Sequence, residues 1–284
     1  YVEAHSNLGA MLQELGRLDE ALTSYKQAIA LKPDYVEALY NLSIVQSYMN
    51  NSEAEMVSLR NILQMDADNY GLRASVNLAI CNFLENNFER SKKHLLAAEK
   101  IQEKKSSKFK NEKVYRKYLL DVLNWDEEKY FNVCNRKADK TLYVIGESHS
   151  LVSHQLLAQS SDSVMLCKAK LIKGCKQWHL GNPFRNEYKY QFESIFCALP
   201  KHSYVLLAIG EIDCRLETGI IAHKKKFPEK QIKEIILTTV ENYLLYIVNN
   251  NSDCHHKVIV QGVPCPNINI KNHSERDIKQ LAEV

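Results

Sequence analysis

The sequence lacks several features that mark whole classes of protein. No window approaches about 18 consecutive apolar residues, so we expect no membrane-spanning helix. The formal net charge of +3 over 284 residues is too small to indicate a nucleic-acid-binding protein. The first residues do not show the basic-then-apolar pattern of a signal peptide. We therefore expect neither a membrane nor a nucleic acid among the partners.

The eight cysteines are scattered, with no C-x-x-C pair and no zinc-type spacing of Cys and His. His255 and His256 are adjacent but have no third ligand nearby, so we expect no metal site and no cofactor. Cys197 lies in an apolar helical pattern, which predicts a small buried residue. Cysteines scattered in this way are typical of a cytoplasmic protein whose thiols are reduced.

The first hundred residues repeat with a period of 34 residues, because Tyr1-Val-Glu-Ala recurs as Tyr35-Val-Glu-Ala. Each repeat contains two amphipathic helical patterns separated by a turn that contains Gly or Asn. We expect the leucines at equivalent positions to pack in the core: Leu8, Leu42 and Leu78. The chain begins in the middle of this pattern, so we expect it to be an excerpt with further repeats upstream.

A helix–turn–helix period of this length resembles the tetratricopeptide repeat (TPR) family. Five residues of the first repeat fit the family pattern: Leu8, Gly9, Tyr25, Ala28 and Pro33. The later repeats depart from the family pattern, since Ser43 and Ala79 occupy the position of Gly9 in the first repeat. The resemblance implies a helical solenoid of about three repeats over residues 1–103. Its concave groove would bind a protein or peptide.

Residues 104–137 are predicted to be a helical cap and linker. The segment 114–123 has helical periodicity and is expected to cover the end of the solenoid by burying Leu119, Leu120 and Val122. A polar stretch then separates it from the next domain, which we place at residues 138–284.

The sequence pattern of residues 138–284 indicates an α/β domain, which we expect to be incomplete at its carboxyl end. Apolar strands alternate with helical patterns, and this rhythm indicates a parallel sheet covered on both faces. We predict strands at 141–146, 163–169, 203–210 and 257–263, and helices at 150–159, 186–198, 228–249 and from about Ser274. Gly146, Gly210 and Gly262 would then follow strands along one edge of the sheet, where ligands bind in such folds.

Ser148 follows the first of these strands directly, in Gly146-Glu147-Ser148-His149. It is either a nucleophile, presented where helix-terminal N–H groups can stabilise negative charge, or an N-cap serine before a helix. The nucleophile elbow Gly-x-Ser-x-Gly does not fit, because Ser150 stands where its second glycine belongs.

The order of these motifs resembles the SGNH (GDSL-like) hydrolases. Gly146-Glu147-Ser148 is similar to that family's Gly-Asp-Ser block, and Gly210-Glu211-Ile212-Asp213 is similar to its Gly-x-Asn-Asp block. The resemblance implies a three-layer α/β/α domain of flavodoxin-like type. It also implies Ser148 as nucleophile, with its own N–H and that of Gly174 binding the oxyanion.

The match has three departures. Glu147 replaces the family's aspartate, and Ile212 replaces its oxyanion-hole asparagine. The Asp-x-x-His block that supplies the general base is absent, and His273 comes too early to replace it. We therefore expect the catalytic histidine to lie outside this chain.

The neighbouring polar residues have alternative interpretations. Glu211 and Asp213 either support the Glu147–Ser148 turn or make a structural pair with Arg215. His149 is either a surface residue or, with Glu147 and Arg215, part of a pocket. Trp178 and His179 either line a pocket or, for Trp178, belong to the core.

The sequence thus predicts a serine esterase of SGNH type joined to a TPR protein-interaction module. An acylated carbohydrate or another small ester is the expected substrate. The alternative is a scaffold whose second domain has kept the fold and lost catalysis.

Overall fold

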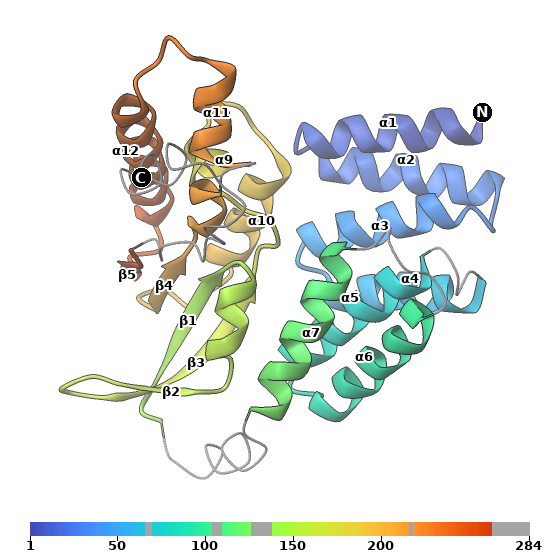
Figure 1. Ribbon diagram of the computed structural model, residues 1–284, viewed down its shortest axis with the longest axis horizontal. Helices are drawn as coiled ribbons and strands as arrows, with labels where there is room; N and C mark the ends of the chain where they lie inside the picture. Colours follow the sequence, from blue (N-terminus) through green and yellow to red (C-terminus); the bar gives the residue numbers. More distant parts are fainter. Residues whose placement is uncertain (66–69, 104–109, 126–137, 216–217, 263–284) are drawn as a thin grey trace. The chain divides into compact units, whose positions relative to one another are not determined.

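The computed structural model describes residues 1–65, 70–103, 110–125, 138–215 and 218–262 (Figure 1). The chain divides into two compact units, residues 1–137 and residues 138–284.

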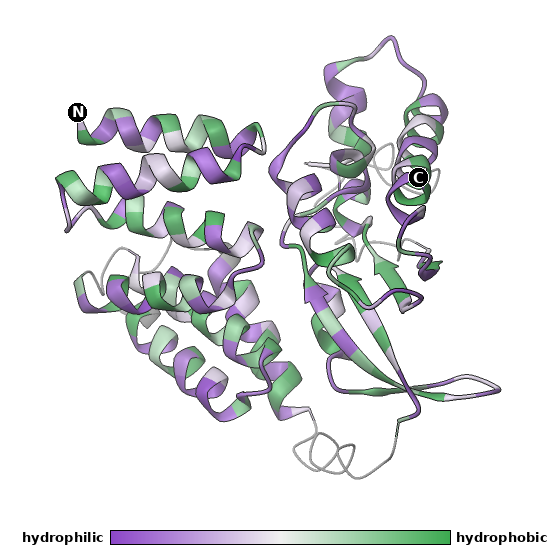
Figure 2. Ribbon diagram, turned by 180° about the vertical axis from the view of Figure 1, so that it is seen from behind, coloured by the Kyte–Doolittle hydropathy of each residue, from purple (hydrophilic) through white to green (hydrophobic). Residues whose placement is uncertain are grey.

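The described part of the first unit contains helices and no strands. Its described helices are α1 (Val2–Glu14), α2 (Leu18–Leu31), α3 (Val36–Tyr48), α4 (Ser52–Met65), α5 (Gly71–Leu84), α6 (Phe88–Glu103) and α7 (Lys110–Asn124). Helices α1, α3 and α5 each pack against the next helix in sequence, and α2 and α4 pack against the helix that opens the following repeat. Hydrophobic and hydrophilic residues alternate along these helices (Figure 2), as expected where one face is buried. The predicted helical array is therefore confirmed.

The turn inside each repeat has the same backbone geometry. Gly16, Asn50 and Asn86 have φ of 69°, 56° and 64° and follow the first helix of each repeat. This left-handed conformation suits Gly and Asn best, and it commonly ends a helix. The Gly or Asn of the sequence pattern thus has a direct structural reason.

The repeat core contains most of the predicted residues. Leu42 and Leu78 are buried, but Leu8 is 48% exposed, so its predicted packing role is wrong. Leu8 lies in α1, the first helix of the array. Helix α7 packs against α5 and α6 and buries Leu119 and Val122, while Leu120 is only partly buried.

The second unit contains a five-stranded sheet. The strands are β1 (Lys140–Gly146), β2 (Leu157–Gln159), β3 (Val164–Leu171), β4 (Tyr204–Ala208) and β5 (Lys257–Val260), in the order β2-β3-β1-β4-β5. Its helices are η1 (Ser148–Ser153), α9 (Gln177–Gly181), α10 (Glu187–Phe196), η2 (Glu211–Cys214), α11 (Ile220–Lys226) and α12 (Ile232–Asn251). Four strands are parallel and β2 is antiparallel to β3, so the sheet is mixed rather than purely parallel.

The helix predicted at 150–159 is wrong. The chain makes a short 3₁₀ helix over Ser148–Ser153, turns at Gln155 with φ of 62°, and then forms strand β2. Leu157 pairs with Leu166 of β3, so pairing with a neighbouring strand overrides the local helical pattern. The helix predicted from Ser274 lies outside the described residues.

The sheet buries side chains on both faces. Ile145, Val205 and Leu207 face a core formed with α9, α10 and α12, whose buried side chains include Leu180, Phe192, Phe196, Tyr243 and Ile247. Leu142, Val144 and Cys167 belong to a second cluster, which contains only strand residues within the described part of the chain. A second helical layer therefore stays a prediction.

Candidate functional site

Three turns meet at the carboxyl edge of the sheet, because β3, β1 and β4 are neighbours and parallel. The N–H of Ile172, after β3, donates to the carbonyl of Gly146 at 2.7 Å. The N–H of Glu147, after β1, donates to the carbonyl of Ala208 at 3.4 Å. The backbone of Gly210, after β4, lies close enough to the Glu147 carboxyl group to lower its pKa. The turn that carries Ser148 is thus held between the other two.

Gly146 makes the closest approach in this arrangement. A Cβ at this position would lie 2.3 Å from the carbonyl oxygen of Ala208, far inside van der Waals contact. Glycine is therefore required because β1 and β4 approach each other closely at the point where β1 ends.

Ser148 is the first residue of η1 and is partly exposed. Glu147, not Ser148, occupies the N-cap position, and no side chain caps this helix, so the N-cap interpretation is wrong. The Ser148 hydroxyl makes no hydrogen bond with any described residue. The Oγ of Ser150 donates to the Glu147 carbonyl at 2.6 Å and so closes this turn. His149 is exposed to solvent.

Glu147 is the most perturbed carboxyl group of the cluster. Only 3% of the residue is exposed, and its Oε1 has no hydrogen-bond partner among the described residues. Its pKa is raised to about 8, chiefly by burial and also by the negative charges of Glu211 and Asp213, while Arg215 and the Gly210 backbone oppose the shift. Glu147 is therefore largely protonated and neutral at pH 7.

Asp213 and Glu211 have structural partners. The Asp213 carboxylate accepts the N–H of Gln177 at 2.8 Å and that of Trp178 at 3.4 Å, at the start of α9. Burial raises the pKa of Asp213 to about 6, although these N–H groups oppose the shift. Glu211 makes a two-pronged ion pair with Arg215, with 2.6 Å between Oε2 and Nη2. The interpretation of a pair with Arg215 thus applies to Glu211, and Asp213 instead anchors α9.

Gly174 lies in the turn after β3 with φ of 79°, a conformation that favours glycine. A side chain there would meet only the Tyr188 hydroxyl, at 3.6 Å. Among the described residues, nothing accepts the N–H of Gly174 or the N–H of Ser148. Both donors are therefore available to a ligand.

Several other sequence-based expectations need correction. Trp178 is 47% exposed and lines a cavity, so the pocket interpretation applies to it rather than the core one. His179 stacks on Tyr188 at 4.0 Å between ring centroids, and its Nδ1 accepts the Lys176 N–H at 3.1 Å, so it stabilises the turn before α9. Burial lowers the pKa of His179 to about 4. Cys197 is exposed, because α10 ends at Phe196 and Cys197 follows it as the C-cap.

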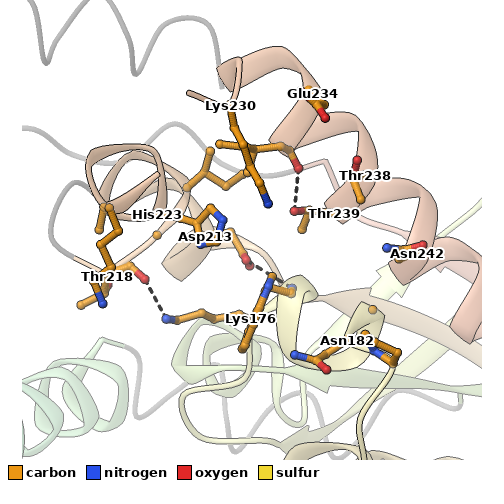
Figure 3. Close-up of a pocket in the computed structure, with 18 residues that line it drawn as sticks. Lys176, Asn182, Asp213, Thr218, His223, Lys230, Glu234, Thr238, Thr239 and Asn242 are labelled. Carbon is orange, nitrogen blue, oxygen red and sulfur yellow. Dashed lines mark hydrogen bonds between the residues drawn. The ribbon is translucent and has the colours of Figure 1, made fainter. Parts of the chain in front are cut away.

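A cavity of about 630 Å³ lies beside this cluster, between α9, α11 and α12 (Figure 3). Asp213 and Trp178 line it, but Ser148 does not. Lys230 projects into it from one side and Lys176 reaches across another, where its Nζ donates to the Thr218 carbonyl at 2.7 Å (Figure 3). The polar wall on α12 is formed by Glu234, Thr238, Thr239 and Asn242.

Sequence reasoning missed this cavity. Its polar residues on α11 and α12 occupy positions that look like an ordinary solvated helix face, and the lysine run that contains Lys226 gives the same impression. Only the packing of α9 against α12 turns these faces toward a common space.

Within the described ranges, no group of three or more His, Cys, Asp or Glu side chains is placed to hold a metal ion. None of the described helices is long and apolar enough to cross a membrane.

Comparison with known families finds one match. The family described as TPR repeat matches residues 11–47, which include all of α2, the end of α1 and most of α3. No curated protein matches the chain. The amino-terminal unit is therefore a helical array in which residues 11–47 are similar to the TPR repeat family.

Proposed function

We propose that the second unit is a serine ester hydrolase of SGNH type and that the repeat unit recruits its protein partner. One observation carries the proposal: the partly exposed Ser148 hydroxyl, which has no hydrogen-bond partner among the described residues, is held at the carboxyl edge of the sheet, in the turn next to the one that contains Gly174. This is the edge at which open α/β sheets bind their ligands.

In this mechanism the Ser148 Oγ attacks the carbonyl carbon of a small ester, such as an acylated carbohydrate. The N–H groups of Ser148 and Gly174 stabilise the negative charge that develops on the carbonyl oxygen. A histidine outside the described residues takes the hydroxyl proton and returns it to the leaving alcohol. Asp213 and Glu211 act as strand-end supports, through α9 and Arg215.

The electrostatics of Glu147 support the same reaction. An ionised carboxylate next to Ser148 would repel the developing oxyanion. Burial keeps the pKa of Glu147 at about 8, so the group is mostly neutral at pH 7 and this repulsion is reduced.

The repeat unit supports the recruiting role. The matched TPR repeat belongs to a class of helical repeats that commonly bind proteins or peptides on a concave face. We propose such a groove as the docking site for a protein or peptide partner.

A second candidate function is a scaffold without catalysis. Two observations favour it: Ile212 stands where the resembling family has its oxyanion-hole asparagine, and the nearby cavity is not lined by Ser148. Loss of one oxyanion donor costs about 3–4 kcal/mol of transition-state stabilisation.

The two functions are separated by p-nitrophenyl acetate turnover and fluorophosphonate labelling of the full-length protein. We expect Ser148→Ala to abolish labelling and to lower turnover by about 10³-fold or more. The matched control is Ser194→Ala, which removes a hydroxyl bonded to the Gln191 carbonyl in α10 and should leave both signals intact. Equal signals in all three proteins would exclude Ser148 as nucleophile and favour the scaffold.

A further inference from the structure

Two cysteines that are far apart in sequence meet on the opposite edge of the sheet from Ser148. Cys197 follows α10 and leads toward β4, and Cys254 lies between α12 and β5. Both therefore precede the amino ends of neighbouring parallel strands. We propose that Cys197 and Cys254 form a reversible disulfide bond by exchange with a small disulfide such as glutathione disulfide.

Three contacts hold the two segments together. The carbonyl of Phe196 lies 3.1 Å from Nε2 of His256, and the two rings are 4.8 Å apart. The N–H of His202 donates to the carbonyl of Cys254 at 3.1 Å. Between these contacts, the thiol of Cys254 lies near enough to the thiol of Cys197 to raise its pKa. These contacts thus bring the segments that carry the two cysteines close together before any oxidation.

Accessibility sets the order of events. Six free cysteines are described, and Cys197 is the one that is exposed, whereas Cys254 is buried. A dissolved disulfide therefore reaches Cys197 first, and Cys254 is positioned to resolve the product. The remaining described cysteines, Cys81, Cys167, Cys175 and Cys214, are buried.

The exchange balances without any group from the protein other than the two thiols. The Cys197 thiolate attacks one sulfur of glutathione disulfide, forms a mixed disulfide and releases one glutathione thiolate. Cys254 then loses its proton and attacks the Cys197 sulfur of the mixed disulfide, releasing the second glutathione. Two protein thiols are oxidised to one disulfide, and one glutathione disulfide is reduced to two glutathiones.

The surroundings make this a slow exchange at neutral pH. Burial raises the pKa of Cys197, and Cys254, Glu193 and Asp253 raise it further, so little thiolate is present. We expect the rate of bond formation to rise with pH, as the thiolate fraction increases.

The bond would join the end of α10 to the end of α12. Phe196, Leu199, Ile247 and Cys254 already belong to one buried cluster, so the link would tie together segments that are packed in the native state. It would close a loop that contains β4, η2, α11 and α12, which restricts the unfolded chain. Because it lies away from the Ser148 turn, its presence or absence does not bear on the proposed hydrolase.

Peptide mapping of the complete chain tests the proposal. After equilibration with rising ratios of glutathione disulfide to glutathione, the protein is alkylated, and its monomer is isolated and digested with trypsin. Cys197 falls in the peptide 190–201 and Cys254 in the peptide 234–257, each with one cysteine. We expect these two peptides to appear linked, and the oxidised protein to melt about 5 °C or more above the reduced one.

Three variants complete the test. Cys254→Ser should trap glutathione on Cys197 as a stable mixed disulfide, and Cys197→Ser should show neither adduct nor link on this pair. Cys81→Ser, which removes a buried thiol of the repeat unit, should keep the link. The proposal is overturned if wild-type protein accumulates glutathione on Cys197 with no linked peptide, or if Cys197 remains unmodified under strongly oxidising ratios. Both outcomes are read on the wild-type chain and do not depend on the folding of a variant.

Discussion

Asp213 Oδ2 accepts the backbone N–H of Gln177 at 2.8 Å, which joins the turn after β4 to the first residue of α9. The same carboxylate accepts the next N–H, that of Trp178, at 3.4 Å. A buried acid thus serves as the acceptor for the free end of a short helix. This role is structural and does not depend on whether the domain is catalytic.

Replacement of Asp213 should lower the free energy of unfolding, and the loss should grow with the number of hydrogen-bond acceptors removed. Asp213→Ala leaves two N–H groups without their acceptor, so we expect a loss of about 1–3 kcal/mol in the free energy of unfolding. Asp213→Asn keeps one carbonyl acceptor and should lose less. Urea unfolding at pH 7, followed by Trp178 fluorescence in a Trp125→Phe background, measures both. Equal losses in the two variants would show that the hydrogen bonds are not the cause.

Glu147 should make the second unit less stable as pH rises. Its pKa is about 8 in the folded protein and 4.5 in the unfolded chain, so the folded state binds the proton more tightly between these values. The free energy of unfolding therefore falls through this window, by at most about 1.4 kcal/mol per pH unit. Asp213, with a folded pKa of about 6, adds a decline over a narrower window.

Glu147→Gln removes the contribution of Glu147 to the pH dependence of stability, which is larger than that of Asp213. We expect the variant to match wild type near pH 4.5 and to be more stable than wild type at pH 8, in urea unfolding series at several pH values. Glu241→Gln, which replaces an exposed carboxylate on α12, is the control and should keep the wild-type slope. A Glu147→Gln slope equal to wild type would contradict the buried, protonated state of this side chain.

Gly146→Ala should damage the sheet where β1 ends. The added methyl group would lie 2.3 Å from the Ala208 carbonyl, so the two strands must move apart. We expect a destabilisation of about 1–3 kcal/mol or more, or loss of soluble protein. Gly262→Ala is the matched control, because a Cβ there meets nothing within 4 Å. Comparable stability of the two variants, measured by thermal unfolding, would argue against this close approach.

The first repeat should show a coupled pair. A Cβ on Gly9 would lie 2.8 Å from the Tyr25 ring, so Gly9→Ala alone should destabilise the array. In the later repeats Ser43 and Ala79 are paired by spacing with Leu59 and Leu95, which are smaller than tyrosine. We therefore expect Gly9→Ala to cost less in a Tyr25→Leu background than in wild type. The coupling energy from the double-mutant cycle measures this, and a value near zero would contradict it.

The elements with strong periodicity could be predicted from sequence. The repeat helices and the strands near 141–146 and 203–210 depend on local apolar patterns, which the structure retains as α1–α6, β1 and β4. The segment 150–159 could not be predicted, because β2 exists through its pairing with β3. Local propensity is a weak guide where a neighbouring strand supplies the stabilising contacts.

The candidate site could be predicted only in part. Strand order places the Ser148, Gly174 and Asp213 turns together, as the α/β pattern suggests. The use of Asp213 as the acceptor for α9, the burial of Glu147 and the thiol pair of Cys197 and Cys254 depend on tertiary packing, which no spacing in the sequence reveals. Cys197 was predicted to be buried because its neighbours are apolar, yet it follows the end of α10 and is open to solvent.

Because β1 lies between β3 and β4, its two neighbours become available one after the other as the chain is synthesised. Pairing of β1 with β3 requires only residues up to Leu171, whereas the turn that faces Glu147 from the other side appears after β4, at Gly210. During synthesis, β3 therefore becomes available to pair with β1 before the turn at Gly210 has been made. We expect that a chain ending before Tyr204 would leave the Glu147 carboxyl group in water, because it lacks β4 and the turn at Gly210.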